Sequence, residues 1–368
     1  MTTDAAPFDP GANAEVAACV RELAGAGPPL VTRLHPADEM YGYELAGHHR
    51  TPETAAVFYF ATGASIFRTV SEIAAWRFGG LGRVRSFLDF AAGYGRATRF
   101  LARALGPERV TMAEIDPGAV RFQQETLGVR SVVSDHDPRR LALEGPFDFV
   151  LAISLFSHLP AGRFEAWLDR LDALVAPGGV LVFSTHGERL APEAERPGAS
   201  GLSFRPESET ERLDGNEYGT SWVAPRYVRA ASAALPGRAR RLFVFSEGLC
   251  GYQDLYVLAK PPLPEGPEPA LSRDPAGALD HAAVEGGTVS ARGWALGASD
   301  ERPPDVRLFF GGELAATSPG AGEPGARREW RLTFSTSAVS PDAIVRFEAV
   351  SARGARRLLV AETLRPYL

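Results

Sequence analysis

Cysteine is scarce in this sequence. The 368 residues include only Cys19 and Cys250, which are too far apart in the chain to suggest a CxxC redox or zinc element. No hydrophobic run approaches the length of a membrane span, and the first residues lack the basic stretch and apolar block of a signal peptide. We therefore expect a cytoplasmic protein with no membrane partner.

Positive charge is not in excess either. Lys and Arg number 39 against 45 Asp and Glu, so the net charge is −6. This balance provides no electrostatic footprint for nucleic acid, and the short run Arg353, Arg356 and Arg357 is more typical of a solvated strand face than of a binding patch. The 7 histidines include no HxxxH pair. We expect neither a nucleic-acid partner nor a metal.

What the chain does contain is a regular alternation of short apolar strands and helices from Val84 onward. Each strand is followed by a helix and lacks polar alternation, which predicts a parallel sheet covered on both faces. The last two strands, 241–248 and 254–260, are separated by a few residues and should pair antiparallel. We predict an α/β Rossmann-like fold, with a mostly parallel seven-stranded sheet that ends in an antiparallel hairpin.

Composition changes divide the chain further. Aromatic residues mixed with helix formers predict an N-terminal helical cap over 1–83, before the sheet domain over 84–260. A proline-rich linker over 261–278 cannot continue a helix or a central strand. Beyond it, 279–368 alternates strand patterns with turn residues, which predicts a small all-β, sandwich-like domain.

The strongest chemical signal is the segment Asp89-Phe90-Ala91-Ala92-Gly93-Tyr94-Gly95-Arg96, placed where the first strand ends and a helix begins. Glycines there let the backbone approach a ligand, and the N–H groups of the following helix favour an anionic group. Glu114 ends the next strand, where a carboxylate can accept both hydroxyls of a ribose, and Asp135 ends the third, where it can accept from the amine of adenine. Together they outline a nucleoside site at the carboxyl edge of the sheet.

With these motifs, residues 38 to 260 resemble the class I S-adenosylmethionine-dependent methyltransferases, in particular a bacterial branch with a SLxSHL segment followed by PGGxLVFSxHG. Ala91 stands in place of the first motif glycine and Glu114 in place of the commoner aspartate. The segment after Gly93 lacks the third glycine that a NAD-binding turn needs. The resemblance implies S-adenosyl-L-methionine as cofactor and S-adenosyl-L-homocysteine as product. It implies cofactor contacts from Tyr59, Gly63, Asp89, Ala91, Gly93, Tyr94, Gly95, Arg96, Glu114, Ile115, Asp135, His136 and Ser154.

The acceptor side should be built from the ends of the fourth and fifth strands. His158 and His186 follow these strands, and either could act as a general base because imidazole titrates near neutral pH. The alternative is that His158 caps the helix that follows it and that His186 bonds a loop carbonyl. We expect Phe156, Tyr218 and Trp222 to line an acceptor pocket, and the insertion from Gly187 to about Tyr218 is a candidate lid.

These patterns predict methyl transfer to a small molecule or sugar, at oxygen rather than nitrogen, in secondary-metabolite or glycan biosynthesis. The alternative is a non-catalytic Rossmann-like scaffold whose β domain binds a partner or a carbohydrate. Trp294 and Trp330 in that domain could stack on a sugar, although core tryptophans are commoner. The β domain could also form a homodimer surface or cover the acceptor pocket, and the sequence does not choose between these roles.

Overall fold

The computed structural model describes residues 7–47, 51–207, 214–237, 240–285, 287–335, 339–340 and 342–364. The chain forms two compact units, one of Met1–Thr69 with Ser272–Leu368 and one of Val70–Leu271. The second unit contains the expected sheet domain. The first brings the N-terminal residues together with the C-terminal strands, a grouping that the predicted boundaries did not include.

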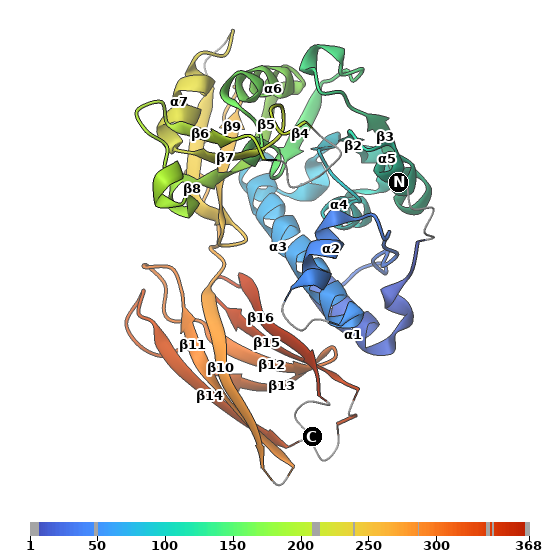
Figure 1. Ribbon diagram of the computed structural model, residues 1–368, viewed down its shortest axis with the longest axis vertical. Helices are drawn as coiled ribbons and strands as arrows, with labels where there is room; N and C mark the ends of the chain where they lie inside the picture. The colour runs from blue at the N-terminus through green and yellow to red at the C-terminus, as the bar shows by residue number, and fades with distance from the viewer. Residues whose placement is uncertain are drawn as a thin grey trace. The chain divides into compact units, whose positions relative to one another are not determined.

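The unit of Val70–Leu271 contains a mixed sheet whose first five strands run parallel in the order β3-β2-β1-β4-β5 (Figure 1). β9 lies antiparallel to β5, and β8 lies antiparallel to β9. The predicted Rossmann-like fold with a terminal hairpin is therefore confirmed. The strands are β1 (Phe87–Phe90), β2 (Val110–Glu114), β3 (Arg130–Val133), β4 (Phe147–Ala152), β5 (Val175–Gly187), β8 (Arg241–Leu249) and β9 (Gln253–Ala259).

Helices connect these strands and bury one face each. In α6, the buried residues Phe164, Trp167, Leu168 and Leu171 recur at the spacing of one helical face. They pack against the sheet core, where Phe164 and Phe183 of β5 have ring centroids 6.4 Å apart. The helices are α4 (Thr98–Leu105), α5 (Pro117–Leu127), α6 (Ala161–Ala173) and α7 (Pro225–Ala233).

The segment expected as a lid contributes strands instead of only a loop. β5 continues to Gly187, and its end pairs with β7 (Thr220–Val223), which in turn pairs antiparallel with β6 (Leu202–Arg205). The pairing places His186 beside Trp222. Residues 208–213 of the predicted lid lie outside the described residues.

In the other unit, two antiparallel sheets form the predicted sandwich. One has the order β10-β11-β14 and the other β13-β12-β15-β16. Trp330 lies between them, 2% exposed, with its ring stacked on Phe347 at 5.6 Å. The strands are β10 (Ala276–Glu285), β11 (Thr288–Leu296), β12 (Asp305–Phe310), β13 (Glu313–Ser318), β14 (Arg328–Ser335), β15 (Ile344–Val350) and β16 (Arg356–Thr363). β10 begins inside the stretch predicted as a linker.

The first helix of the chain, α1 (Ala14–Ala24), is tied to this sandwich. Glu22 accepts hydrogen bonds from Arg346 of β15 at 2.5 Å and from Arg356 of β16 at 2.8 Å. Cys19 donates to the carbonyl of Gly311 at 3.1 Å. Arg346 has no exposed side chain surface, so removing Glu22 would leave a buried guanidinium with less compensating charge.

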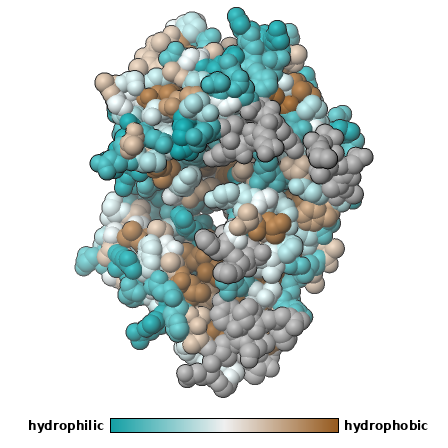
Figure 2. Space-filling model, in the orientation of Figure 1, coloured by the Kyte–Doolittle hydropathy of each residue, from teal (hydrophilic) through white to brown (hydrophobic). Residues whose placement is uncertain are grey.

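Two more helices, α2 (Glu39–Ala46) and α3 (Pro52–Phe78), follow α1 where helical segments were expected. No helix in the described part of the chain combines the length and apolar character that a bilayer crossing requires. On the face shown in Figure 2, hydrophobic residues form small groups between hydrophilic ones.

Candidate functional site

The turn between β1 and α4 has the geometry that its glycines predict. Gly93 and Gly95 have positive φ angles of 54° and 86°. Ala91, in the place of the first motif glycine, also has a positive φ of 56°, which costs an L-residue about 1–2 kcal/mol. Strain of this kind persists where the surroundings over-determine the backbone, and it concentrates at functional sites.

Two buried polar side chains, which the sequence analysis did not identify, donate hydrogen bonds to backbone carbonyls of this turn. Gln123 of α5 donates to the carbonyl of Gly93 at 2.8 Å. Arg99 of α4, 2% exposed, donates through Nε to the carbonyl of Gly95 at 3.0 Å. A Cβ on Gly95 would lie 2.9 Å from both Gln123 Oε1 and Leu127 Cδ1. A polar residue on the apolar face of a predicted helix was the available signal for Gln123.

Glu114 is held at the end of β2 by backbone donors. Its Oε2 accepts from the N–H of Gly93 at 2.9 Å, and its Oε1 accepts from Ile115 at 2.7 Å and Asp116 at 3.2 Å. Burial raises the pKa of this carboxyl, while the three N–H donors counteract the rise. An ionised carboxylate offers about four lone-pair sites, so the orientation set here leaves acceptor capacity for hydroxyl groups.

Asp89 lies at the end of β1 and is 3% exposed. Its Oδ2 accepts a hydrogen bond from Thr98 Oγ1 of α4 at 2.7 Å. Burial raises the pKa of Asp89 to about 7, and the nearby charge of Glu114 adds to the rise. Two neighbouring carboxyl groups on adjacent strands, one buried and one half-buried, favour a cationic ligand at this edge, because its charge would offset their repulsion.

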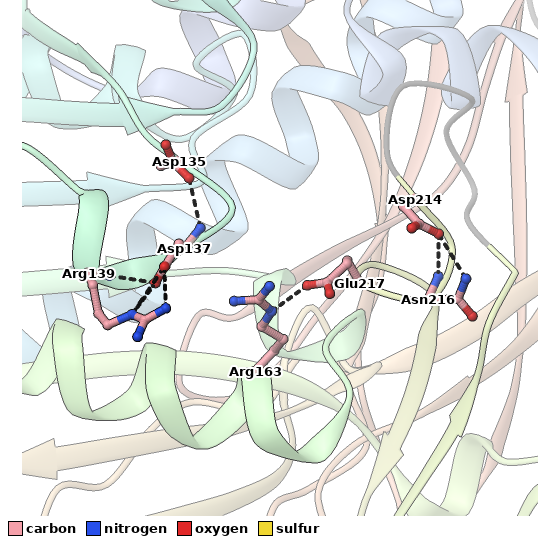
Figure 3. A network of polar contacts seen from close by, with 7 residues as sticks. All are labelled: Asp135, Asp137, Arg139, Arg163, Asp214, Asn216 and Glu217. Carbon is pink, nitrogen blue, oxygen red and sulfur yellow. Dashed lines mark hydrogen bonds and ion pairs between the residues drawn. The ribbon is translucent and has the colours of Figure 1, made fainter.

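The loop after β3 carries the predicted adenine contacts. Asp135 is half-buried and accepts from the N–H of Asp137 at 2.9 Å, whereas His136 is exposed. Asp137 in turn binds Arg139, and separately Arg163 of α6 forms an ion pair with Glu217 (Figure 3). The ion pair joins α6 to the segment that precedes β7.

Tyr94 and Arg96, also predicted as cofactor contacts, follow Gly93 and Gly95 within the turn. The hydroxyl of Tyr94 donates to Asp116 Oδ2 at 3.1 Å, and the ring packs against Phe122 of α5 with centroids 5.6 Å apart. The side chain of Tyr94 is therefore directed toward α5. Arg96 is half-buried.

Ser154, directly after β4, belongs to a closed set of hydrogen bonds that the sequence did not reveal. Its backbone has a positive φ of 65°. Its N–H donates to Ser184 Oγ at 2.9 Å, Ser184 Oγ donates to Gln253 Oε1 at 2.6 Å, and Gln253 Nε2 donates to Ser154 Oγ at 3.0 Å. The ends of β4 and β5 and the start of β9 are thus fixed together by three side chains.

His158 is fixed by the loop before β7. Its Nδ1 lies 2.8 Å from the carbonyl oxygen of Gly219, and its own carbonyl accepts from the N–H of Gly219 at 2.9 Å. A carbonyl can only accept, so Nδ1 carries the hydrogen and the lone pair of the neutral ring is on Nε2. Tyr218 stacks on the imidazole, with centroids 4.6 Å apart and an interplanar angle of 15°.

His186, at the end of β5, completes a row of rings. Its centroid lies 5.9 Å from that of His158 and 5.7 Å from that of Tyr252. Burial, and then the neighbouring His158, lower the pKa of His186 to about 4. The structure therefore brings both predicted histidines together and keeps His186 neutral at physiological pH.

The two other predicted acceptor residues, Phe156 and Trp222, are buried. Phe156 has no exposed surface and packs between Phe164 and Phe183, with centroids 4.7 and 4.8 Å away. Trp222 is 6% exposed and lies beneath the guanidinium of Arg205 at 5.3 Å. The ring of Phe156 therefore packs in the core of the sheet domain.

Tyr59 and Gly63 lie on α3 within the other compact unit, so their predicted contact with a cofactor stays a prediction. Tyr59 is buried against Phe60 and Tyr41, with ring centroids 5.5 and 6.4 Å away. The described residues contain no group of three or more His, Cys, Asp or Glu side chains that could hold a metal ion.

A family model described as a methyltransferase domain matches residues 88–181, from β1 into β5. The chain therefore carries a methyltransferase domain over this stretch, which confirms the resemblance drawn from its motifs. A segment of 102 residues is 34% identical to the biotin biosynthesis bifunctional protein BioCD of Bordetella avium (strain 197N). The match covers 27% of this chain and 21% of that relative, so the chain spans about a fifth of its length.

Solved structures also resemble the chain. Magnesium protoporphyrin IX methyltransferase from Synechocystis PCC 6803, with bound SAM, is 16% identical with a TM-score of 0.38, covering 61% of this chain and 92% of its own. An O-methyltransferase family protein from Burkholderia thailandensis is 17% identical with a TM-score of 0.40, covering 58% and 60%. The N-methyltransferase NodS from Bradyrhizobium japonicum WM9 is 15% identical with a TM-score of 0.36, covering 67% and 98%.

Proposed function

We propose that this protein transfers a methyl group from S-adenosylmethionine to a hydroxyl oxygen of a small molecule or sugar, in the biosynthesis of a secondary metabolite or glycan. The observation that carries the proposal is the arrangement at the carboxyl edge of the sheet. The buried Asp89 and the half-buried Glu114 flank the glycine turn; His186 lies at the end of β5, and His158 follows β4 after the short turn Leu155–Ser157.

The residues at this edge fit the cofactor by their chemistry. Glu114 is oriented by three N–H donors as an acceptor for ribose hydroxyls, and Gly93 has open space where a Cβ would otherwise lie. The carboxylates suit the positive charges of the amino acid and sulfonium groups. When bound, the cofactor supplies an electrophilic methyl carbon with a neutral thioether as leaving group.

His158 suits the role of general base. The Gly219 carbonyl keeps the proton on Nδ1, so Nε2 is the nitrogen that accepts the proton of an acceptor hydroxyl while the oxygen bonds to the methyl carbon. Stacking on Tyr218 favours the imidazolium that results. Burial holds the pKa of His186 near 4, so His186 stays neutral and suits orienting the acceptor better than accepting its proton.

Cofactor binding tests the first part of the proposal. Isothermal titration of the purified chain with S-adenosylmethionine, and separately with NAD, is expected to give micromolar affinity for the former alone. Absence of binding to both would contradict the enzyme reading and favour a scaffold that acts through its β domain.

Acceptor screening tests the second part. Phenols and sugars are incubated with the protein and labelled cofactor, and the methylated atom is identified by mass spectrometry. With an active acceptor, His158→Asn is expected to lower turnover by about 100-fold or more, and His186→Asn by less. Equal turnover in both variants and the parent would show that neither histidine is a general base, and that the protein accelerates the reaction by aligning the two reactants.

A further inference from the structure

The outer face of the β10-β11-β14 sheet carries a row of basic side chains, two of them arginines, that is not visible in the sequence. The register places His281 of β10 opposite Arg292 of β11, and Arg292 opposite Arg331 of β14. All three residues are exposed. Because neighbouring strands lie about 4.8 Å apart, the row spans only about 10 Å.

Like charges placed directly opposite each other across two strands destabilise a sheet. Within the described part of the chain, Arg292 and Arg331 have no ion pair or side-chain hydrogen bond that would offset this repulsion. Among the side chains that the structure describes, the acidic neighbours of the arginines are Asp280, next to His281 on β10, and Glu329, which lies 3.6 Å from Arg327. An anion bound between Arg292 and Arg331 would remove the repulsion.

Trp294 lies on the same face, two residues from Arg292. It is half-buried and paired with Ala278 on one side and Glu329 on the other, and the guanidinium of Arg327 lies 4.5 Å from its ring. Two residues along a strand correspond to about 7 Å. Because Ala278 is small, the surface next to the Trp294 ring is flat. Ser290 and Thr333, which lie opposite each other on this face, add hydroxyl groups.

We propose that this face binds an acidic saccharide, with a carboxylate of a sugar between Arg292 and Arg331 and a sugar ring against Trp294. Guanidinium groups bind carboxylates in a bidentate manner, and aromatic rings pack against the apolar face of a pyranose. This face has few arginines and the whole chain has a net negative charge, whereas a nucleic acid needs many contacts to its phosphates. A short acidic saccharide therefore suits the face better. This inference does not depend on the methyl acceptor of the other unit.

The test is titration calorimetry of the full chain with a galacturonic acid trisaccharide and with the matched neutral galactose trisaccharide. We expect binding of the acidic probe that weakens with salt, and little binding of the neutral one. Arg292→Gln and Arg331→Gln should each weaken binding of the acidic probe by about 10-fold to 100-fold, while Arg273→Gln, an exposed cation of the same unit, should leave it unchanged.

Thermal unfolding without ligand gives an independent readout. Because each substitution removes a like-charge contact, both Arg292→Gln and Arg331→Gln are expected to unfold at the same temperature as the parent or slightly higher. A clear loss of thermal stability would mean that the arginines support the fold and would overturn the proposal. No binding of the acidic trisaccharide, equal binding of both trisaccharides, or Arg292-dependent binding of a DNA oligonucleotide instead would also overturn it.

Discussion

The positive φ of Ala91 allows a direct test of the strained turn that ends β1. In the left-handed region an alanine costs about 1–2 kcal/mol that a glycine does not. Replacing alanine by glycine also costs about 0.5–1 kcal/mol, because the unfolded chain gains freedom. Ala91→Gly should therefore leave the free energy of unfolding unchanged or raise it by up to about 1.5 kcal/mol.

Ala92 provides the matched control, since it is the next residue, is also half-buried and is not among the described non-glycine residues with positive φ. Ala92→Gly has the same entropy cost but relieves no backbone strain, so it should lower the free energy of unfolding by about 0.5–1 kcal/mol. The difference between the two variants isolates the strain and should be about 1–2 kcal/mol.

Urea unfolding of the parent and the two variants, followed by tryptophan fluorescence and by circular dichroism, measures this difference. Both probes are needed because the chain has two units and each can unfold separately. Equal destabilisation by Ala91→Gly and Ala92→Gly would show that the Ala91 backbone is not strained, and the reasoning would fail.

Three further predictions concern the site. Glu114→Gln should weaken S-adenosylmethionine binding by about 10-fold or more in calorimetry, because a charged acceptor is lost, whereas the control Glu108→Gln, at an exposed carboxylate before β2, should bind as the parent does. Burial raises the pKa of Asp89 to about 7, so the folded chain holds this proton more tightly than the unfolded chain. The stability that protonation of Asp89 contributes is lost as pH rises from about 4 to about 7, by up to about 1.4 kcal/mol per pH unit. Urea unfolding at about pH 5 and about pH 7 measures this loss, and Asp89→Asn should not show it. Gln253→Met should lower turnover by about 10-fold and also weaken cofactor binding, since Ser154, a predicted cofactor contact, and Ser184 lose their shared partner; unchanged turnover and affinity would remove Gln253 from the positioning of the site.

Much of the fold was predictable because local sequence determines it. The apolar segment at 86–90 followed by glycines and a helical pattern corresponds to β1, the turn and α4, and the short connection before 254–260 corresponds to the β8–β9 hairpin. α1 was covered only by the general prediction of a helical cap over 1–83, and its attachment to the β domain was missed because its partners Arg346 and Arg356 lie more than 300 residues away. β10 was missed because it follows directly on a proline-rich stretch.

In the candidate site, too, some features could be predicted from the sequence and others could not. Strand ends could be located from the sequence, so Asp89, Glu114, Ser154, His158 and His186 were predicted to lie at one edge of the sheet. Their partners could not, because Gln253 and Gly219 come from segments about 60 to 100 residues further along the chain and no local pattern marks them. The sequence around Phe156 also did not indicate that its ring packs between Phe164 and Phe183.

The sequence by itself determined the order of strands and helices, the glycine turn and the acidic strand ends, because these depend on backbone propensity, hydrophobic periodicity and residue type. Only the tertiary structure decided which nitrogen of His158 carries its proton, how Ser154 is held in a strained backbone, and that Arg292 lies opposite Arg331. The physical reason is that hydrogen-bond partners and cross-strand neighbours are set by register between distant segments, and a shift of one residue would turn each side chain to the other face.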